Sequence, residues 1–175
     1  MHELGAGLGL AGLVLSKVAS TLVLSDFNER VVTNLGENVL LNDGGDRCRA
    51  CRLDWSNLEN AEPWTREPCE LIVASDVICC VADALLFAAV VSRLLRPSGA
   101  AVVVLPSPEN RFGTEAFGPA LTAAGLSWES HQISAQRMVS GIEDFLSFDL
   151  FVIWWPEASE DAFVDSCRNI RESVR

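Results

Sequence analysis

The sequence has few basic side chains and no apolar run long enough to cross a membrane. Its 175 residues contain 13 Lys and Arg against 24 Asp and Glu, a formal net charge of −11. Proteins that follow nucleic-acid phosphates need a basic face, so this balance excludes a nucleic-acid binder. A membrane span needs about 18 or more apolar residues in a row, and no signal-peptide pattern opens the chain. We therefore expect no membrane association and a location in the cytoplasm or the nucleus.

Histidine and paired cysteines are also scarce. The chain has two histidines and six cysteines: Cys48, Cys51, Cys69, Cys79, Cys80 and Cys167. A structural zinc ion needs four ligands, and only Cys48 and Cys51 have Cys-x-x-Cys spacing. The spacing is equally unlike the disulfide framework of a small secreted domain. We predict reduced thiols and no metal site, with Cys79 and Cys80 as small buried residues.

Strand-like and helical segments alternate along most of the chain. Strands are predicted over 21–26, 48–53, 70–74 and 100–105, and helices over 10–18, 28–41, 82–95 and 111–124. Two further strands, 127–133 and 148–155, have no helical pattern between them, so we expect an antiparallel pair at a sheet edge. A surface helix is expected over 157–175. This order predicts an α/β fold with a three-layer, doubly wound, Rossmann-like sheet in a single domain, 1–175. We also expect the domain to be a monomer.

Glycines at alternate positions distinguish the start of the chain. The segment Glu3–Gly9 lets a ligand lie against bare backbone, because glycine permits positive φ and has no side chain. A helix beginning near Leu8 would add unpaired N–H groups for a polar ligand. Such a loop follows a buried strand, yet only Met1 and His2 precede this motif. We therefore expect the first of seven strands to be largely missing and its neighbours to lack a ladder partner.

Three acids stand where predicted strands end: Asp26, Asp54 and Asp76. A doubly wound sheet binds ligands at the carboxyl ends of its strands, so these acids and the glycine loop are expected at one edge. The pattern predicts a nucleotide-type pocket. Capping of the following helices is an alternative for Asp26 and Asp76, and core packing is the alternative for Trp55.

Two nucleotide cofactors fit this pattern to different degrees. The spacing Gly7–Gly12 followed by Asp26 matches a dinucleotide fold, but the extra Gly5, the acid Glu3 and the lack of a second domain disfavour a nicotinamide cofactor. S-adenosylmethionine fits better. Its ribose diol suits the Asp26 carboxylate, its adenine suits the polar and flat pair Asp54–Trp55, and its cationic end suits nearby acids.

Together these motifs resemble the seven-β-strand protein-lysine methyltransferases grouped as methyltransferase family 16. The resemblance runs from Glu3 to Trp155, and its most specific parts are 3–12, 25–28, 53–55 and 74–78. The segment Ser107–Arg111 is similar to one found in the calmodulin-lysine methyltransferases of this family.

The resemblance implies transfer of a methyl group from S-adenosylmethionine to the ε-amine of a protein lysine. It assigns cofactor binding to Glu3, Gly5, Gly7, Gly9, Asp26, Asn28, Asp54, Trp55 and Ser75. The Asp-x-x-Tyr motif of the family falls on 76–79, so it assigns positioning of the lysine to Asp76. Cys79 stands in place of the tyrosine, and the chain has no tyrosine at all.

The acidic composition favours a protein substrate with a basic surface and disfavours acidic calmodulin. Three alternatives remain open. One is a methyltransferase with another acceptor, such as a small molecule or a different side chain. Another is a non-catalytic interaction domain derived from this fold, motivated by Cys79 and the short N-terminus. The last, ranked below the others, is a nicotinamide-dependent oxidoreductase.

Overall fold

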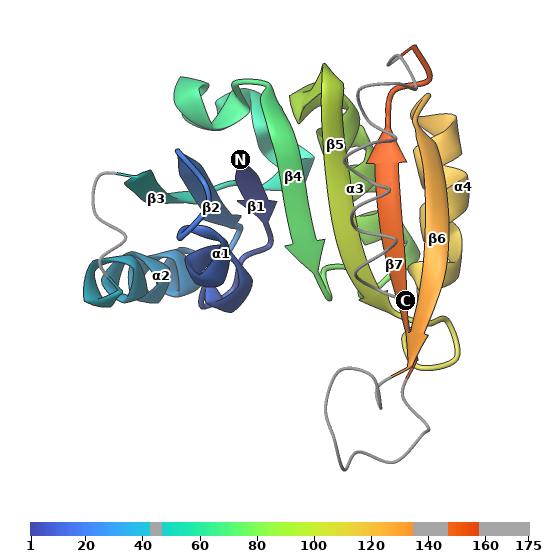
Figure 1. The fold of residues 1–175 in the computed structure, drawn as a ribbon, viewed down its shortest axis with the longest axis horizontal. Coiled ribbons are helices and arrows are strands. Elements are labelled where there is room, and N and C mark those ends of the chain that lie inside the picture. Colours follow the sequence, from blue (N-terminus) through green and yellow to red (C-terminus); the bar gives the residue numbers. More distant parts are fainter. Residues whose placement is uncertain (43–46, 135–146, 158–175) are drawn as a thin grey trace.

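The structure is a computed structural model that describes residues 1–42, 47–134 and 147–157. At its centre is a seven-stranded sheet with the order β3-β2-β1-β4-β5-β7-β6 (Figure 1). The strands are β1 His2–Leu4, β2 Leu22–Asp26, β3 Cys48–Arg52, β4 Cys69–Ser75, β5 Leu95–Pro106, β6 Ser127–Ser134 and β7 Ser147–Trp154. The first five are parallel, and β7 is antiparallel to both β5 and β6. The predicted α/β class and the antiparallel C-terminal pair are confirmed.

The short strand β1 lies between β2 and β4. It has three residues. The expectation that β2 and β4 lack a hydrogen-bonded partner strand is wrong where β1 lies between them. His2 and Glu3 pair with β2 and β4 at once, and Leu4 adds a third pair with β2. These residues thus supply the central strand just before the glycine loop, with partners on both sides at His2 and Glu3 and on the β2 side alone at Leu4.

Helices connect the parallel strands. They are α1 Leu10–Leu15, α2 Glu29–Leu41, α3 Val81–Leu94 and α4 Phe117–Ala123, with 3₁₀ turns η2 Trp55–Asn60, η3 Pro63–Arg66 and η4 Thr114–Ala116. The helix predicted over 111–124 begins later than expected, because Gly113 has φ 93°, which a helix does not accommodate. Helix α1 is also shorter than predicted. The turn at 43–46, Cys167 and almost all of the surface helix predicted over 157–175 lie outside the described residues.

Two buried clusters lie on opposite faces of the sheet. Leu22 and Leu24 of β2 pack against Leu35 of α2, whereas Leu4 packs with the cluster around α3 and α4. Leu4 pairs with Ser25, and alternation along β2 turns that position away from the Leu22 and Leu24 side. The sheet therefore forms the middle of three layers, as predicted. In the described ranges, no helix has the length and apolarity that a membrane crossing requires.

Candidate functional site

The glycine loop leads from β1 into α1. Gly5, Gly7 and Gly9 have φ values of 67°, 55° and 88°, in the left-handed region that favours glycine. A Cβ atom at Gly5 would lie 2.6 Å from a methyl carbon of Val77. Only glycine therefore lets the loop approach the segment after β4 this closely. Helix α1 begins at Leu10, the first residue of the range predicted from the apolar pattern, with Gly9 as its N-cap.

Asp26 joins the end of β2 to this loop. Its Oδ2 accepts a hydrogen bond from the Gly7 N–H at 3.1 Å, and its Oδ1 accepts one from the Asn28 N–H at 3.0 Å. Carboxylate oxygens have further lone pairs, so Asp26 keeps acceptor capacity for hydroxyl groups such as those of a ribose. The alternative that Asp26 caps α2 is wrong. The cap is Asn28, whose side chain accepts from the N–H groups of Arg30 and Val31.

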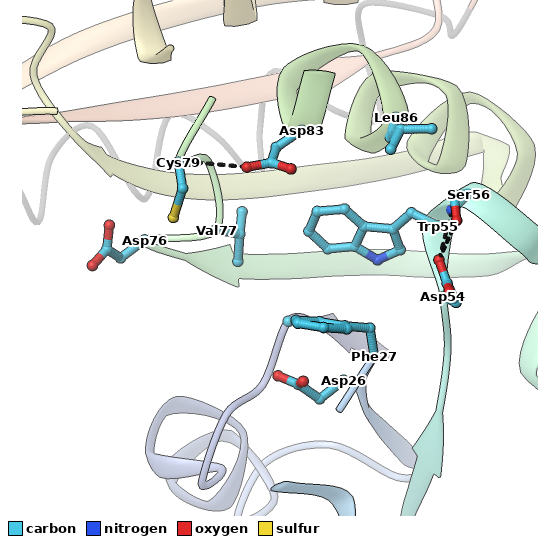
Figure 2. A pocket seen from close by; sticks show the side chains of 11 residues that line it. Asp26, Phe27, Asp54, Trp55, Ser56, Asp76, Val77, Cys79, Asp83 and Leu86 are labelled. Atoms are coloured by element: carbon cyan, nitrogen blue, oxygen red, sulfur yellow. Dashed lines mark hydrogen bonds between the residues drawn. The ribbon is translucent and has the colours of Figure 1, made fainter. Parts of the chain in front are cut away.

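A cavity of about 480 Å³ opens at the carboxyl ends of β1 to β4 (Figure 2). That volume is in the range of about 300–1,000 Å³ typical of small-molecule sites. Its lining consists of Gly5, Asp26, Phe27, Asp54, Trp55, Ser56, Asp76, Val77, Cys79, Asp83 and Leu86. Four of these eleven residues are aspartates and none is Lys or Arg. Arg111, which is not among these residues, offsets the charge of Asp76, and the remaining three aspartates favour a ligand with positive charge.

Aromatic rings lie on two sides of one end of the cavity. The Trp55 indole packs edge-on against Phe87 of α3, with ring centroids 5.1 Å apart, and it also lines the cavity. Phe27 lies across the cavity from Trp55 (Figure 2) and is 66% exposed. Asp54 Oδ1 accepts from the Ser56 hydroxyl at 2.6 Å and the Ser56 N–H at 3.0 Å, and these bonds lower the pKa of Asp54. This end offers two flat apolar surfaces beside an ionised acceptor.

Glu3 lies beneath the glycine loop and does not line the cavity. It is only 3% exposed, and burial raises the pKa of its carboxyl group to about 7. Among the described residues Oε2 has no hydrogen-bond partner, and it lies against Gly12, where no other residue would leave space for it. Glu3 therefore shapes the loop from below.

The structure brings half of the sequence-predicted residues to the cavity: Gly5, Asp26, Asp54, Trp55 and Asp76. The others lie around it without lining it: Glu3, Gly7, Gly9, Asn28 and Ser75. Six lining residues were not predicted as site residues: Phe27, Ser56, Val77, Cys79, Asp83 and Leu86. The sequence could have indicated Phe27, because it directly follows Asp26 at the end of a strand. For Asp83 and Leu86 no signal existed, because the packing of α3 brings them there.

The sequence model of one known family covers most of these features. This family, described as lysine methyltransferase, matches residues 1–117, which include the glycine loop and the three strand-end acids. The chain belongs to the lysine methyltransferase family. The resemblance drawn from the motifs is thereby confirmed.

Two curated proteins with similar sequences are named as protein-lysine methyltransferases. The calmodulin-lysine N-methyltransferase of Arabidopsis thaliana is 29% identical over 163 residues, which are 84% of this chain and 52% of that protein. The protein-lysine N-methyltransferase EEF2KMT of Homo sapiens is 27% identical over 153 residues, 78% of this chain and 46% of that protein. The chain thus spans about half the length of the curated relatives it matches.

Solved structures share the fold. A TehB-like S-adenosylmethionine-dependent methyltransferase from Corynebacterium glutamicum superposes with a TM-score of 0.63 at 18% identity, covering 88% of this chain and 78% of that one. A methyltransferase with the same cofactor from Aquifex aeolicus gives 0.62 at 17% identity, covering 87% and 80%. At these identities the similarity establishes the architecture alone.

In this lysine methyltransferase family member, Asp76 is held at the end of β4. It has φ 55°, a conformation that aspartate tolerates better than most residues, and its N–H donates to the Val104 carbonyl oxygen at 2.9 Å. Asp76 does not cap the next helix, because the N-cap of α3 is Cys80. The N–H groups of Cys79 and Cys80 both donate to Asp83 Oδ2 at 3.0 Å.

Cys79, which stands at the tyrosine position of the family motif, lines the cavity. The prediction that Cys79 and Cys80 are buried is wrong: Asp83 holds the backbone of both residues, Cys79 is exposed and Cys80 is half-buried. The Cys79 thiol and the Asp76 carboxylate lie beyond Val77 from Trp55 (Figure 2). This end is therefore separate from the aromatic end. Within the described part of the chain, no three His, Cys, Asp or Glu side chains form a group that could hold a metal ion.

Proposed function

We propose that residues 1–175 form an S-adenosylmethionine-dependent methyltransferase domain that methylates the ε-amine of a lysine in a protein. One observation carries the proposal: the family's glycine loop and strand-end acids surround one cavity at the carboxyl ends of four parallel strands. Both curated relatives described above are protein-lysine N-methyltransferases by name.

In this proposal the cofactor lies along the cavity with its adenine between Phe27 and Trp55. Asp26 accepts hydrogen bonds from the ribose hydroxyls, and Asp54 accepts one from the adenine amino group. The methionine part follows the bare backbone of the glycine loop at Gly5. Support comes from charge: S-adenosylmethionine carries a sulfonium and an ammonium against one carboxylate, and four aspartates line the cavity.

The acceptor lysine enters at the Asp76 and Cys79 end. When bound, S-adenosylmethionine supplies a methyl group on a good leaving group, so the protein has to align a neutral amine with it. A lysine ε-amine has a reference pKa near 10.4, so it arrives as the ammonium ion and loses its proton at the site before the methyl transfer, in this proposal to water. The Asp76 carboxylate positions the amine by accepting a hydrogen bond from it. No side chain is assigned as a general base.

The substrate in this proposal is a protein with a basic surface around the target lysine. The formal net charge of −11 would attract such a partner and speed the encounter. We further propose that the domain acts as a monomer, in the cytoplasm or the nucleus.

The first experiment is calorimetric titration of S-adenosylhomocysteine into the purified chain. Saturable one-to-one binding is expected, with weaker binding by Asp26→Asn and unchanged binding by Glu70→Gln, whose exposed carboxylate lies away from the cavity. Transfer of labelled methyl groups from S-adenosylmethionine to lysine-centred peptides then tests the acceptor. Binding of NAD in place of S-adenosylhomocysteine would overturn the assignment.

A further inference from the structure

The guanidinium group of Arg111 is paired with the Asp76 carboxylate, which the proposed function assigns to binding of the acceptor lysine. Arg111 Nη2 donates to Asp76 Oδ2 at 2.7 Å, and Arg111 Nη1 lies 3.8 Å from Cys79 Sγ. Arg111 comes from the segment after β5, far in sequence from both partners. A lysine ammonium and this guanidinium would seek the same oxygen atoms, and their like charges disfavour simultaneous binding.

The backbone around Arg111 is fixed on both sides. The N–H groups of Asn110 and Arg111 donate to the carbonyl oxygen of buried Ser107, and the Thr114 hydroxyl donates to the Arg111 carbonyl oxygen. Gly113 presses against the start of α3: a Cβ there would lie 2.5 Å from the Cys80 carbonyl carbon. The placement of Arg111 beside Asp76 is thus built into the fold, whereas its long side chain keeps rotational freedom.

The contact itself is weak enough to exchange. It is a single hydrogen-bonded ion pair between side chains that are 36% and 50% exposed. Measured exposed ion pairs change an equilibrium by about fivefold or less, so a competing cation can displace the guanidinium. An uncharged acceptor, such as a hydroxyl group, brings no charge in exchange.

We propose that Arg111 is a specificity-determining gating residue: it covers Asp76 until the ammonium group of an acceptor lysine displaces it. The inference rests on the proposed function, and it explains how an open acceptor site with cysteine in place of tyrosine selects amines. Arg111 keeps uncharged acceptors from Asp76 and takes no part in the methyl transfer itself.

Nuclear magnetic resonance of the Arg111 Nε–Hε group tests the exchange without turnover. The signal is assigned by its loss in Arg111→Gln, and n-propylammonium chloride is added to the protein with and without S-adenosylhomocysteine. We expect the signal to move toward its position in Asp76→Asn, while that of Arg96, paired with Glu70 elsewhere on the surface, stays in place. Equal movement with sodium chloride or n-propanol, or no movement, would overturn the proposal.

Steady-state kinetics with a lysine-containing peptide that the enzyme methylates provide the second test. Arg111→Gln should lower KM for the peptide by about two- to fivefold and leave kcat and S-adenosylhomocysteine affinity unchanged. The matched variant Arg96→Gln should alter none of these values. In an Asp76→Asn background the effect of Arg111→Gln on KM should vanish, because Arg111 and the lysine then have no carboxylate for which to compete.

A higher KM in Arg111→Gln would instead make Arg111 a substrate-binding group and refute gating. If the unmodified chain did not bind S-adenosylhomocysteine, that result would count against the proposed function alone. The resonance experiment would still measure whether n-propylammonium displaces Arg111 from Asp76.

Discussion

Asp26 Oδ2 accepts a hydrogen bond from the Gly7 N–H at 3.1 Å, which ties the loop after β1 to the end of β2. The same carboxylate lines the cavity, so one side chain shapes the loop and faces the ligand. A loop with three left-handed glycines has many conformations in the unfolded chain, and this bond selects one of them. The two tasks of Asp26 are therefore coupled.

Replacement of Asp26 by alanine should weaken S-adenosylhomocysteine binding by about 1.5–3 kcal/mol, the range for hydrogen bonds to a charged group. Asp26→Asn keeps one acceptor oxygen and should lose less. Calorimetric titration of both variants measures the effect, with Glu70→Ala as the control at an exposed acid outside the cavity. Affinity equal to that of the unmodified chain would contradict the ribose assignment.

Phe27 should contribute to cofactor affinity with little effect on stability, because its side chain is 66% exposed. Phe27→Ala should weaken S-adenosylhomocysteine binding by about 0.5–1.5 kcal/mol, the value of one aromatic contact. Phe112→Ala is the matched control, since Phe112 is 71% exposed and does not line the cavity. Equal losses in the two variants would argue against stacking of adenine on Phe27.

Glu3 makes stability depend on pH. Burial raises the pKa of Glu3 from 4.5 to about 7, so the folded chain binds the proton more tightly than the unfolded chain. The free energy of unfolding therefore falls as pH rises from about 4.5 to about 7, and then stays low. Glu3→Gln removes this loss, so its stability relative to the unmodified chain should increase by about 2–4 kcal/mol between pH 4.5 and pH 8.

Urea unfolding at several pH values checks this difference. The control is Glu70→Gln, in which an exposed carboxylate on the same sheet is neutralised. A difference between Glu3→Gln and the unmodified chain that does not change with pH would show that the Glu3 carboxyl is not buried against Gly12 as described.

Asp76→Ala should reduce methyl transfer far more than cofactor binding, because the proposed role of Asp76 is to position the acceptor amine. Loss of a group that orients a reacting partner typically costs about 10²-fold or more in rate. Single-turnover transfer and S-adenosylhomocysteine titration on the same preparation separate the two effects. Equal losses in transfer and binding would assign Asp76 to the cofactor.

The sequence alone determined the alternation of strands and helices, the glycine loop and the acids at the strand ends. These features are local: glycine spacing, apolar periodicity and an acid after a strand need no knowledge of distant contacts. The parallel sheet then brings the strand ends to one edge, as the pattern of Asp26, Asp54 and Asp76 indicated.

Only the tertiary structure decided which side chains face the cavity. Asn28, predicted to bind the cofactor, caps α2, and Glu3 is buried beneath the loop, because loop geometry sets where each side chain points. Arg111 reaches Asp76 across 35 positions of sequence, since the turn after β5 and Gly113 press that segment against α3. Contacts of this kind depend on how separate elements pack, which no local pattern in the sequence records.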